Sequence, residues 1–519
     1  MNYQEQSQRA IKGFEDFLHT PLEKFLQQHL DKNPATEIIN LFKDVAANVP
    51  AYKAFLSQEQ INPDTIQTFE DFQKLPPLTK DNYLKRYPLA DFCRHGKIES
   101  CDMIAASSGS TGKPTFWLRF FTDELKIATR FEQIFYDSFF ADSKRTLAVV
   151  CFALGTWVGG IFSTTCCRYL SSKGYPITVI SPGSNKEEIL RVVSELSPNF
   201  DQTVLLGYPP FLKDVIDTGT ARGMEWQQYH IKFVMAGEVF SEEWRSLVGE
   251  RIGSENLCYD FASLYGTADA GVLGNETPLS ICIRQFLAKN PYAARTLFGE
   301  SRLPTLVQYD PMIRFFEVIP SSSDSSNQEG IENKQGIETG TLLFSGDNGI
   351  PLVRYNILDN GGIITYDAML QFLSEWGFNP IEALSNGRGI RNLPFVFIFG
   401  RSNFTISYFG ANIYPENIKV GLEQPVIRDW VTGKFVMEIL EDADKNRFLS
   451  IVVELAPEVE ASDEKKQAVA DSILKELIRL NSEFANYVPP EYQIPQVRLL
   501  PMGEPEYFPL GVKHRYTRS

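Results

Sequence analysis

A loop rich in small and hydroxyl residues is the most informative segment of the sequence. It reads Ser-Ser-Gly-Ser-Thr-Gly-Lys-Pro-Thr over residues 107–115 and lies between an apolar stretch at 104–106 and a strand-like segment. Such a loop can turn several backbone N–H groups and hydroxyls toward one anion, and Lys113 adds a positive charge. It is not a Walker A loop, because Ser107 stands where that motif requires glycine. A phosphate-binding loop and a flexible polar hairpin tip both fit this composition.

Three more motifs follow short apolar segments. They are Gly-Thr-Trp-Val-Gly-Gly at 155–160, Ala-Gly-Glu at 236–238 and Ser-Leu-Tyr-Gly-Thr-Ala-Asp-Ala-Gly at 263–271. A tyrosine offers a flat face for stacking, and an aspartate offers the hard oxygen that Mg²⁺ prefers. The first two motifs also have ordinary structural interpretations, the 155–160 segment as a glycine-rich helix start and Glu238 as a solvated loop acid.

The elements that position these motifs alternate between strand and helix patterns. Strands are expected at 146–153, 175–180, 202–208 and 231–237, with helices of about a dozen residues between them. This alternation predicts βαβ units and a buried parallel sheet. Ligands of such sheets bind where loops leave the carboxyl ends of the strands, and the motifs lie in or beside loops of that kind.

The last 120 or so residues have a different pattern. After an apolar strand at 393–399, strands are expected at 437–442 and 448–455, an amphipathic helix at 464–480 and a last strand at 497–501. This segment is long enough for a small core of its own. The expected fold is therefore α/β, with a large N-terminal domain of mixed or parallel sheets flanked by helices, followed by a small α+β C-terminal domain. We place the boundary at 402/403, which gives domains of 1–402 and 403–519.

Composition narrows the class of protein. The chain has 519 residues, 43% hydrophobic and 22% charged, with a net charge of −15, which is typical of a globular protein and argues against nucleic-acid partners. No apolar run reaches the ~18–20 residues of a membrane span, and the N-terminus lacks a signal peptide's apolar core. Seven cysteines without a CxxC pair and five scattered histidines predict neither a disulfide framework nor a zinc site. We therefore expect a soluble cytoplasmic protein without membrane partners.

Taken together, the motifs resemble those of the adenylate-forming superfamily, which comprises acyl-CoA synthetases, adenylation domains and luciferases. By pattern, the phenylacetate–coenzyme A ligases are the most similar. The resemblance runs from residues 49–56 and 69–80, through the 107–115 loop, to the final twenty residues. It implies an N-terminal AMP-binding domain and a small, mobile C-terminal domain that carries the catalytic lysine.

The resemblance also implies a role for individual residues. Lys113 and Lys513, the latter in Gly-Val-Lys-His-Arg-Tyr at 511–516, would be catalytic, and Asp269 would bind the metal. Tyr265 would stack on adenine, and Asn403 would be the hinge between the domains. The residues implied for the nucleotide and its phosphates are Ser107, Ser108, Gly109, Ser110, Thr111, Gly112, Gly237, Glu238, Tyr265, Gly266, Thr267, Asp359 and Arg401; those implied for the acyl pocket are Gly155, Trp157, Tyr208 and Ala236.

Four positions depart from the family pattern. Ala268 replaces the hydroxyl residue that touches the α-phosphate, and Asp269 replaces a glutamate that is one methylene longer. Asn403 stands where the hinge residue of the family is usually aspartate or lysine. Lys513 stands two positions after Gly511, whereas the family usually has the lysine directly after the glycine. For the ribose ligand, the resemblance favours Asp359, because Arg354 and Tyr355 precede it at the spacing of the family. Asp347 is the other candidate, but it lies in Asp-Asn-Gly, which is a common turn sequence without catalytic implication.

The resemblance implies ATP-dependent activation of a carboxylic acid as an acyl-adenylate, followed by thioester formation with coenzyme A. ATP, Mg²⁺ and coenzyme A would be the cofactors, and the protein would be a monomer or homodimer. The 13% aromatic content and Trp157 near the expected pocket favour an aromatic or apolar acid. Two alternatives stay open: transfer of the acyl group to a carrier-protein thiol or an amine, and a nucleotide-binding protein that has lost catalysis.

Overall fold

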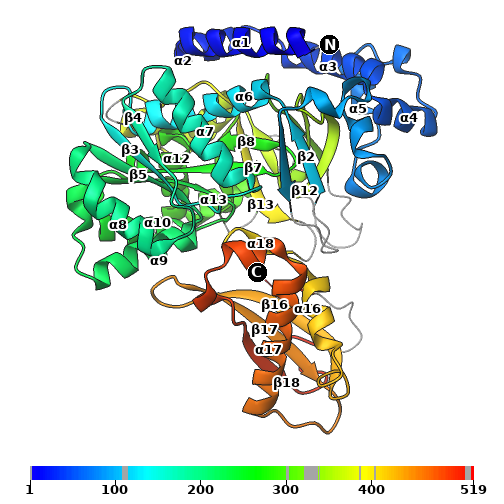
Figure 1. Ribbon diagram of the computed structural model, residues 1–519, viewed down its shortest axis with the longest axis vertical. Coiled ribbons are helices and arrows are strands. Elements are labelled where there is room, and N and C mark those ends of the chain that lie inside the picture. Colours follow the sequence, from blue (N-terminus) through cyan, green and yellow to red (C-terminus); the bar gives the residue numbers. More distant parts are fainter. Residues whose placement is uncertain are drawn as a thin grey trace.

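The chain folds into two lobes of unequal size (Figure 1). The computed structural model describes residues 3–107, 115–299, 303–320, 337, 339–384, 387–401, 405–508 and 516–518. We call residues 3–401 the N-terminal lobe and the residues from 405 onward the C-terminal lobe. Within the described ranges, no helix is both long and apolar enough to cross a membrane.

A large mixed sheet runs through the N-terminal lobe. Its strands are β3 (Thr146–Val150), β4 (Ile177–Ile180), β5 (Gln202–Gly207), β6 (Ile231–Ala236), β7 (Phe261–Thr267), β8 (Gly271–Asn275), β9 (Thr305–Gln308), β10 (Phe315–Pro320), β11 (Thr339–Gly346), β12 (Leu352–Ile364) and β13 (Phe395–Arg401). Their order is β10-β11-β12-β13-β9-β8-β7-β6-β5-β3-β4. The pairs from β4 to β7 are parallel, whereas the pairs from β7 to β10 are antiparallel.

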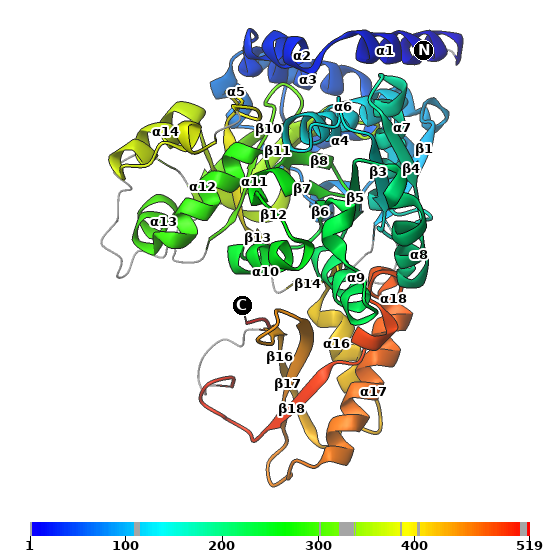
Figure 2. The ribbon, with the colours of Figure 1, turned by 90° about the vertical axis from the view of Figure 1, so that its left-hand side faces the viewer.

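Helices follow the parallel strands and cover the sheet. Four of them, α7 (Val158–Ser172), α8 (Lys186–Leu196), α9 (Pro209–Ala221) and α10 (Glu242–Ile252), come directly after β3, β4, β5 and β6. Figure 2 shows α9 and α10 on the face of the N-terminal lobe that is turned toward the C-terminal lobe. The predicted βαβ alternation and the predicted α/β fold class are therefore confirmed.

The N-terminal lobe holds further helices, the first three of which along the chain form its upper edge in Figure 1. They are α1 (Tyr3–His19), α2 (Leu22–Leu30), α3 (Pro34–Asn48), α4 (Pro50–Gln58), α5 (Phe69–Gln73), α6 (Phe121–Gln133), α11 (Leu257–Asp260), α12 (Pro278–Lys289), α13 (Pro291–Phe298), α14 (Tyr366–Glu375) and α15 (Pro380–Ala383). A separate antiparallel pair, β1 (Met103–Ser107) and β2 (Thr115–Arg119), flanks the candidate phosphate loop.

The C-terminal lobe is built on a small three-stranded sheet. Its strands are β16 (Val431–Glu441), β17 (Arg447–Leu455) and β18 (Gln496–Leu500), and its helices are α16 (Pro415–Leu422), α17 (Asp463–Leu480) and α18 (Ser482–Tyr487). A short hairpin, β14 (Ile406–Tyr408) and β15 (Ala411–Ile413), opens the lobe. The chain end returns to this sheet, because the Met437 N–H donates to the Tyr516 carbonyl at 2.8 Å.

Leu205 on β5 tests how much the parallel half of the sheet contributes to stability. It is fully buried, at 0% exposed, between β3 and β6. Leu205→Ala is expected to lower the free energy of unfolding by about 2–5 kcal/mol, because the truncation leaves a cavity in a packed core. Leu196→Ala, at a helix end that is 37% exposed, is the matched control, with an expected change of about 0.5 kcal/mol or less. Denaturant unfolding measures both, and equal losses would contradict the placement of the core.

Candidate active site

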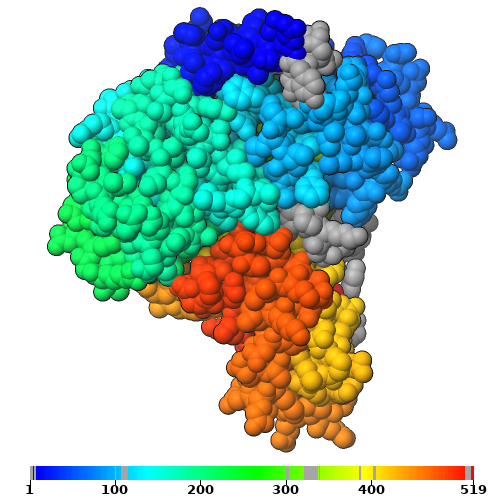
Figure 3. All heavy atoms as spheres, in the orientation of Figure 1, coloured from blue at the N-terminus to red at the C-terminus, as the bar shows by residue number. Residues whose placement is uncertain are grey.

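A cavity of about 840 Å³ lies at the carboxyl ends of the parallel strands, between the two lobes. The loop residues that leave these strands line it: Phe152 after β3, Tyr208 after β5, Gly237 and Glu238 after β6, and Thr267 at the end of β7. This is where an open α/β sheet presents ligand-binding loops. The C-terminal lobe closes against the same region (Figure 3), and Gly410, Arg447 and Tyr487 belong to the cavity wall.

Tyr265 and Asp359 come together on one wall of the cavity. The Tyr265 hydroxyl donates to Asp359 Oδ2 at 2.6 Å, and Asp359 is only 5% exposed. Arg401 lies directly opposite Asp359 in the β12–β13 ladder. Asp347 lies elsewhere, paired with Arg94 at 3.0 Å and not in the wall of this cavity.

Asp269 also lines the cavity, and its carboxylate is held in position by neighbouring side chains. Its Oδ2 accepts a hydrogen bond from the Tyr355 hydroxyl at 2.8 Å and lies 4.0 Å from Lys80 Nζ. The buried Arg119 donates to the backbone carbonyls of Ala268 and Asp269, the latter at 3.2 Å. Lys80 therefore brings a positive charge to the cavity. It ends the 69–80 segment, for which the sequence indicated only a resemblance to the adenylate-forming superfamily and no role at the site.

The carboxylate of Asp269 fits a magnesium ion that is shared with a nucleotide. Among the described residues, no group of three or more His, Cys, Asp or Glu side chains is arranged around one point. An all-protein metal cage is therefore not what these residues build. Mg²⁺ instead commonly takes one or two carboxylates and completes its shell with phosphate oxygens and water.

Comparison with known proteins gives the same fold. No family model matches the sequence. A phenylacetate–coenzyme A ligase of Thermus thermophilus is 22% identical over 381 residues, which are 73% of this chain and 72% of that ligase. A 2-hydroxyisobutyryl-CoA ligase, solved with its acyl-AMP and CoA in the thioesterification state, superposes with a TM-score of 0.65 at 14% identity, over 97% of this chain and 91% of that one. The chain has the adenylate-forming fold.

The same ligase was also solved in a postadenylation state. That structure gives a TM-score of 0.52 at 13% identity, over 93% of this chain and 87% of that one. Because the two structures are of one protein, the difference in TM-score reflects a difference in conformation rather than in sequence.

Two glycines bring the two lobes of the chain together around Tyr208. A Cβ added at Gly237 would lie 3.0 Å from the Tyr208 ring, and one added at Gly410 would lie 2.2 Å from Tyr208 Cε1. Both glycines have positive φ, at +86° and +82°, which other residues rarely adopt. The close approach of the β14–β15 turn to the cavity therefore depends on glycine at both positions.

Aromatic side chains continue this wall toward the C-terminal lobe. Tyr487 of α18 stacks on Tyr208 and meets Trp157 edge-on, with ring centroids 5.0 Å apart in both pairs. Burial raises the pKa of Tyr208 well above its usual value, so its hydroxyl stays protonated. Trp157 and Gly155 do not themselves line the cavity, whereas the next residues, Val158 and Gly159, do.

Glu238 is engaged by the C-terminal lobe. Its Oε1 accepts the Gly410 N–H at 2.6 Å, and its Oε2 pairs with Arg447 Nη1 at 2.5 Å. Burial raises the pKa of Glu238, and the positive charge of Arg447 opposes this rise. Because Glu238 is only 8% exposed, it is not a solvated loop acid. Its contact with a nucleotide stays a prediction. Sequence reasoning missed Arg447, because nothing marks one arginine of an ordinary strand.

Eight of the predicted site residues lie outside the described residues, namely Ser108, Gly109, Ser110, Thr111, Gly112, Lys113, Asn403 and Lys513. Ser107 ends β1 and Arg401 ends β13. The other predicted residues of the nucleotide and acyl sites, apart from Gly155 and Trp157, meet at the one cavity, namely Tyr208, Ala236, Gly237, Glu238, Tyr265, Gly266, Thr267, Asp269 and Asp359.

Proposed function

We propose that this protein activates a carboxylic acid with ATP, as an acyl-adenylate, and then transfers the acyl group to coenzyme A. One observation carries the proposal: a single cavity at the ends of the parallel strands joins Tyr265 and Asp359 to Asp269 and Lys80. A nucleoside and its phosphates need these groups side by side. The similarity to coenzyme A ligases supports the same chemistry.

The first half-reaction makes a good leaving group from a poor one. A carboxylate would have to expel oxide, whereas transfer of AMP from ATP onto it, with release of pyrophosphate, yields a mixed anhydride whose leaving group is AMP. Such a transfer depends on in-line positioning and on stabilising charge at phosphorus rather than on covalent help from the protein. Lys80 and the loop of Lys113 would hold the phosphates, and Lys513 would bridge the substrate carboxylate and the α-phosphate.

Asp269 is the residue that would hold Mg²⁺ on the phosphates. The metal, when bound, supplies positive charge that offsets the phosphate oxygens. The hydrogen bond from Tyr355 and the position of Lys80 orient the Asp269 carboxylate for this contact.

Asp359 would hold the ribose and Tyr265 the adenine. A carboxylate accepts two hydrogen bonds from a diol, and the short hydrogen bond from Tyr265 fixes the Asp359 side chain against the cavity wall. The Tyr265 ring runs nearly parallel to Phe316, at an interplanar angle of 20°. The ring is therefore held on one side, as an aromatic platform for a base should be.

The acid is proposed to be aromatic or apolar. The wall between β3, α6 and α7 is made mainly by apolar side chains, namely Phe131, Phe152, Val158 and Phe162, with Ser163 among them. A pocket of this kind binds a hydrophobic group by burying its surface and selects against charged ones. Tyr208 and Tyr487 would close its far end.

The C-terminal lobe is proposed to be a mobile domain, with domains 1–402 and 403–519 and Asn403 at the hinge. In the arrangement described here, Gly410 and Tyr487 lie against the cavity, which suits the second half-reaction, when the thiolate of coenzyme A attacks the adenylate. The better superposition on the thioesterification state of the 2-hydroxyisobutyryl-CoA ligase supports this assignment. A gated two-step cycle of this kind excludes water from the reactive anhydride.

ATP–pyrophosphate exchange over a panel of aromatic and aliphatic acids tests the first half-reaction. Exchange that depends on one class of acid is expected, with aromatic or apolar acids above charged ones. Free coenzyme A is then added to the best acid. Thioester formation supports the full proposal, whereas exchange without thioester points to a carrier-protein thiol or an amine as acceptor. No exchange with any acid would mean a nucleotide-binding protein without catalysis.

A further inference from the structure

A group of charged side chains joins the two lobes outside the cavity. Lys213 and Asp217 of α9 and Arg251 of α10 meet Asp444 and Asn446, which belong to the turn between β16 and β17. None of the five lines the cavity. We call these five residues the charged clasp. In Figure 1, the β16–β17 turn extends beneath α9.

Lys213 is the centre of the charged clasp. Its Nζ donates to Asp217 Oδ2 at 2.6 Å and to Asn446 Oδ1 at 2.7 Å, and it lies 3.5 Å from Asp444 Oδ2. Its side chain is only 1% exposed. A lysine ammonium is almost never buried unless it is paired, and two of its three partners here come from the other lobe.

Arg251 repeats this arrangement on the neighbouring helix. Its guanidinium pairs with Asp217 within the N-terminal lobe and with Asp444 across the boundary. Asp444 is thereby shared by two cations, and Asp217 balances the same two cations from the other side. Of the four charged members of the clasp, Asp444 alone comes from the C-terminal lobe, so its pairs with Lys213 and Arg251 exist only while the lobes are docked, whereas the pairs with Asp217 lie within the N-terminal lobe.

The turn that carries Asp444 is formed within its own lobe. Asp442 Oδ1 accepts the backbone N–H groups of Asp444 and Asn446, each at 2.9 Å, and Asn446 Nδ2 donates to Asp442 Oδ2 at 3.0 Å. Asp444 therefore needs no contact with the N-terminal lobe to be presented. The residue after Asn446 is Arg447, which reaches Glu238 in the cavity wall. The turn links the clasp directly to the site.

We propose that the charged clasp is the device that selects the lobe arrangement for the second half-reaction, with Asp444 and Lys213 as its positioning residues. This inference rests on the proposed function for its catalytic consequence, but the docking itself does not. The clasp holds the β16–β17 turn on α9 and α10, and the turn places Arg447 on Glu238 beside the Gly410 hairpin. Rotation of the C-terminal lobe away from α9 would separate Lys213 and Arg251 from Asp444.

Charge reversal at the turn is the decisive variant. In Asp444→Lys, a third cation meets Lys213 and Arg251, which opposes docking without touching either core, because the Asp444 side chain is 52% exposed. Single-turnover conversion of a supplied acyl-adenylate and coenzyme A to thioester is expected to slow by about tenfold or more, while pyrophosphate exchange stays the same or rises. Asp429→Lys is the matched control with both rates unchanged, since Asp429 is 79% exposed and pairs with Arg428 in the same lobe.

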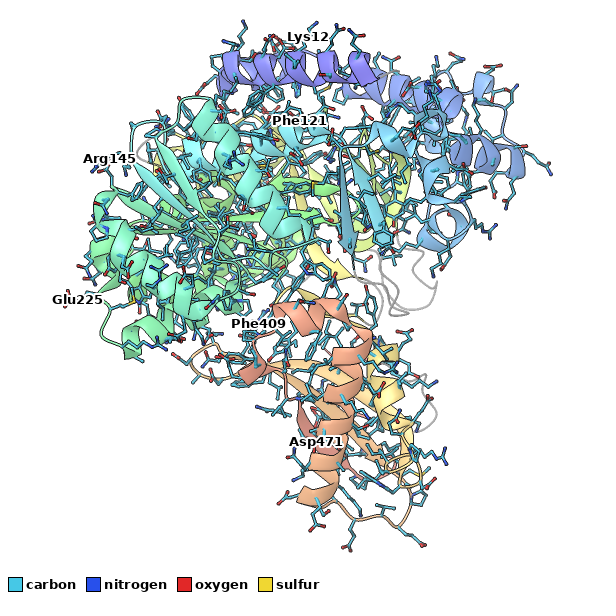
Figure 4. The ribbon with its side chains drawn as sticks, viewed as in Figure 1. Lys12, Phe121, Arg145, Glu225, Phe409 and Asp471 are labelled. Carbon is cyan, nitrogen blue, oxygen red and sulfur yellow. The ribbon has the colours of Figure 1, made fainter. Side chains whose placement is uncertain are left out.

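A distance measurement tests the docking without any substrate. Labels placed by Glu225→Cys in the N-terminal lobe and Asp471→Cys in the C-terminal lobe report the lobe arrangement, since both positions are exposed and far apart on opposite lobes (Figure 4). Asp444→Lys is expected to broaden and shift the distance distribution, and Asp444→Glu, which keeps the charge, is expected to restore it. An unchanged distribution in Asp444→Lys overturns the proposal, as does an equal loss in both half-reactions. If no acid supports exchange in the parent protein, the proposed function fails, and the distances still decide whether the clasp holds the lobes.

Discussion

Replacing Lys513 with alanine is expected to lower pyrophosphate exchange by about two to three orders of magnitude. A charge-assisted contact made mainly in the transition state contributes on the order of 3–4 kcal/mol, which corresponds to this loss in rate. The same variant is expected to convert a supplied acyl-adenylate to the thioester at a near-normal rate, because the bridge between carboxylate and α-phosphate has no role once the adenylate exists. The two half-reactions, measured separately, give the test.

The position of Lys513 in the chain supports this split. Three residues later the chain is fixed to β16, since the Tyr516 carbonyl accepts the Met437 N–H at 2.8 Å and the Arg518 N–H donates to the Met437 carbonyl at 3.0 Å. The segment that carries the lysine is thereby tied to the lobe that is proposed to move. An essential group on a mobile domain can serve one half-reaction and leave for the other.

Lys419→Ala is the control for the Lys513 prediction. Lys419 lies on α16 of the same lobe, is 57% exposed and pairs only weakly with Glu423, at 3.7 Å. It removes the same charge and should change neither rate. Equal losses in both half-reactions of Lys513→Ala would mean that the chain end supports the fold or the acceptor site. No loss in either would make the 511–516 segment a solvated tail.

The parallel half of the sheet was predictable from the sequence because its signals are local. Each strand from β3 to β6 is a short apolar run, and the helix after it has apolar residues at helical spacing. Parallel strands also end at one edge, so motifs scattered over more than a hundred residues could be assigned to one site. The structure brings Tyr208, Glu238, Tyr265 and Asp269 to one cavity for this reason.

The antiparallel half and two of the charged groups could not be predicted in this way. β9 pairs with β13, and no periodicity in either segment indicates that partner or its register. Lys80 reaches Asp269, and Arg447 reaches Glu238, through contacts between distant parts of the chain. A single charged residue in a loop or strand has no pattern of its own, so only the folded chain shows what it meets.

The carboxylate of Asp269 gives the other large expected effect. Asp269→Ala is expected to abolish Mg²⁺-dependent pyrophosphate exchange, whereas Asp269→Glu is expected to keep or improve it, because glutamate has the longer reach found at this position in the family that the sequence resembles. The backbone here does not depend on the side chain, because Arg119 holds the carbonyls of Ala268 and Asp269. The alanine variant therefore removes the proposed metal ligand without releasing the loop.

Exchange measured over a range of Mg²⁺ concentrations separates a metal ligand from a structural carboxylate. Tyr355→Phe removes only the 2.8 Å hydrogen bond to Asp269 Oδ2, so it should cost about tenfold or less and be offset by more Mg²⁺. Asp269→Ala should not be rescued at any concentration, because among the described residues no group of three or more His, Cys, Asp or Glu side chains is arranged to hold the ion in its place. If the alanine variant kept full activity, the metal would bind elsewhere, and Glu238, which is already paired with Arg447, would be the next carboxylate of the cavity to test.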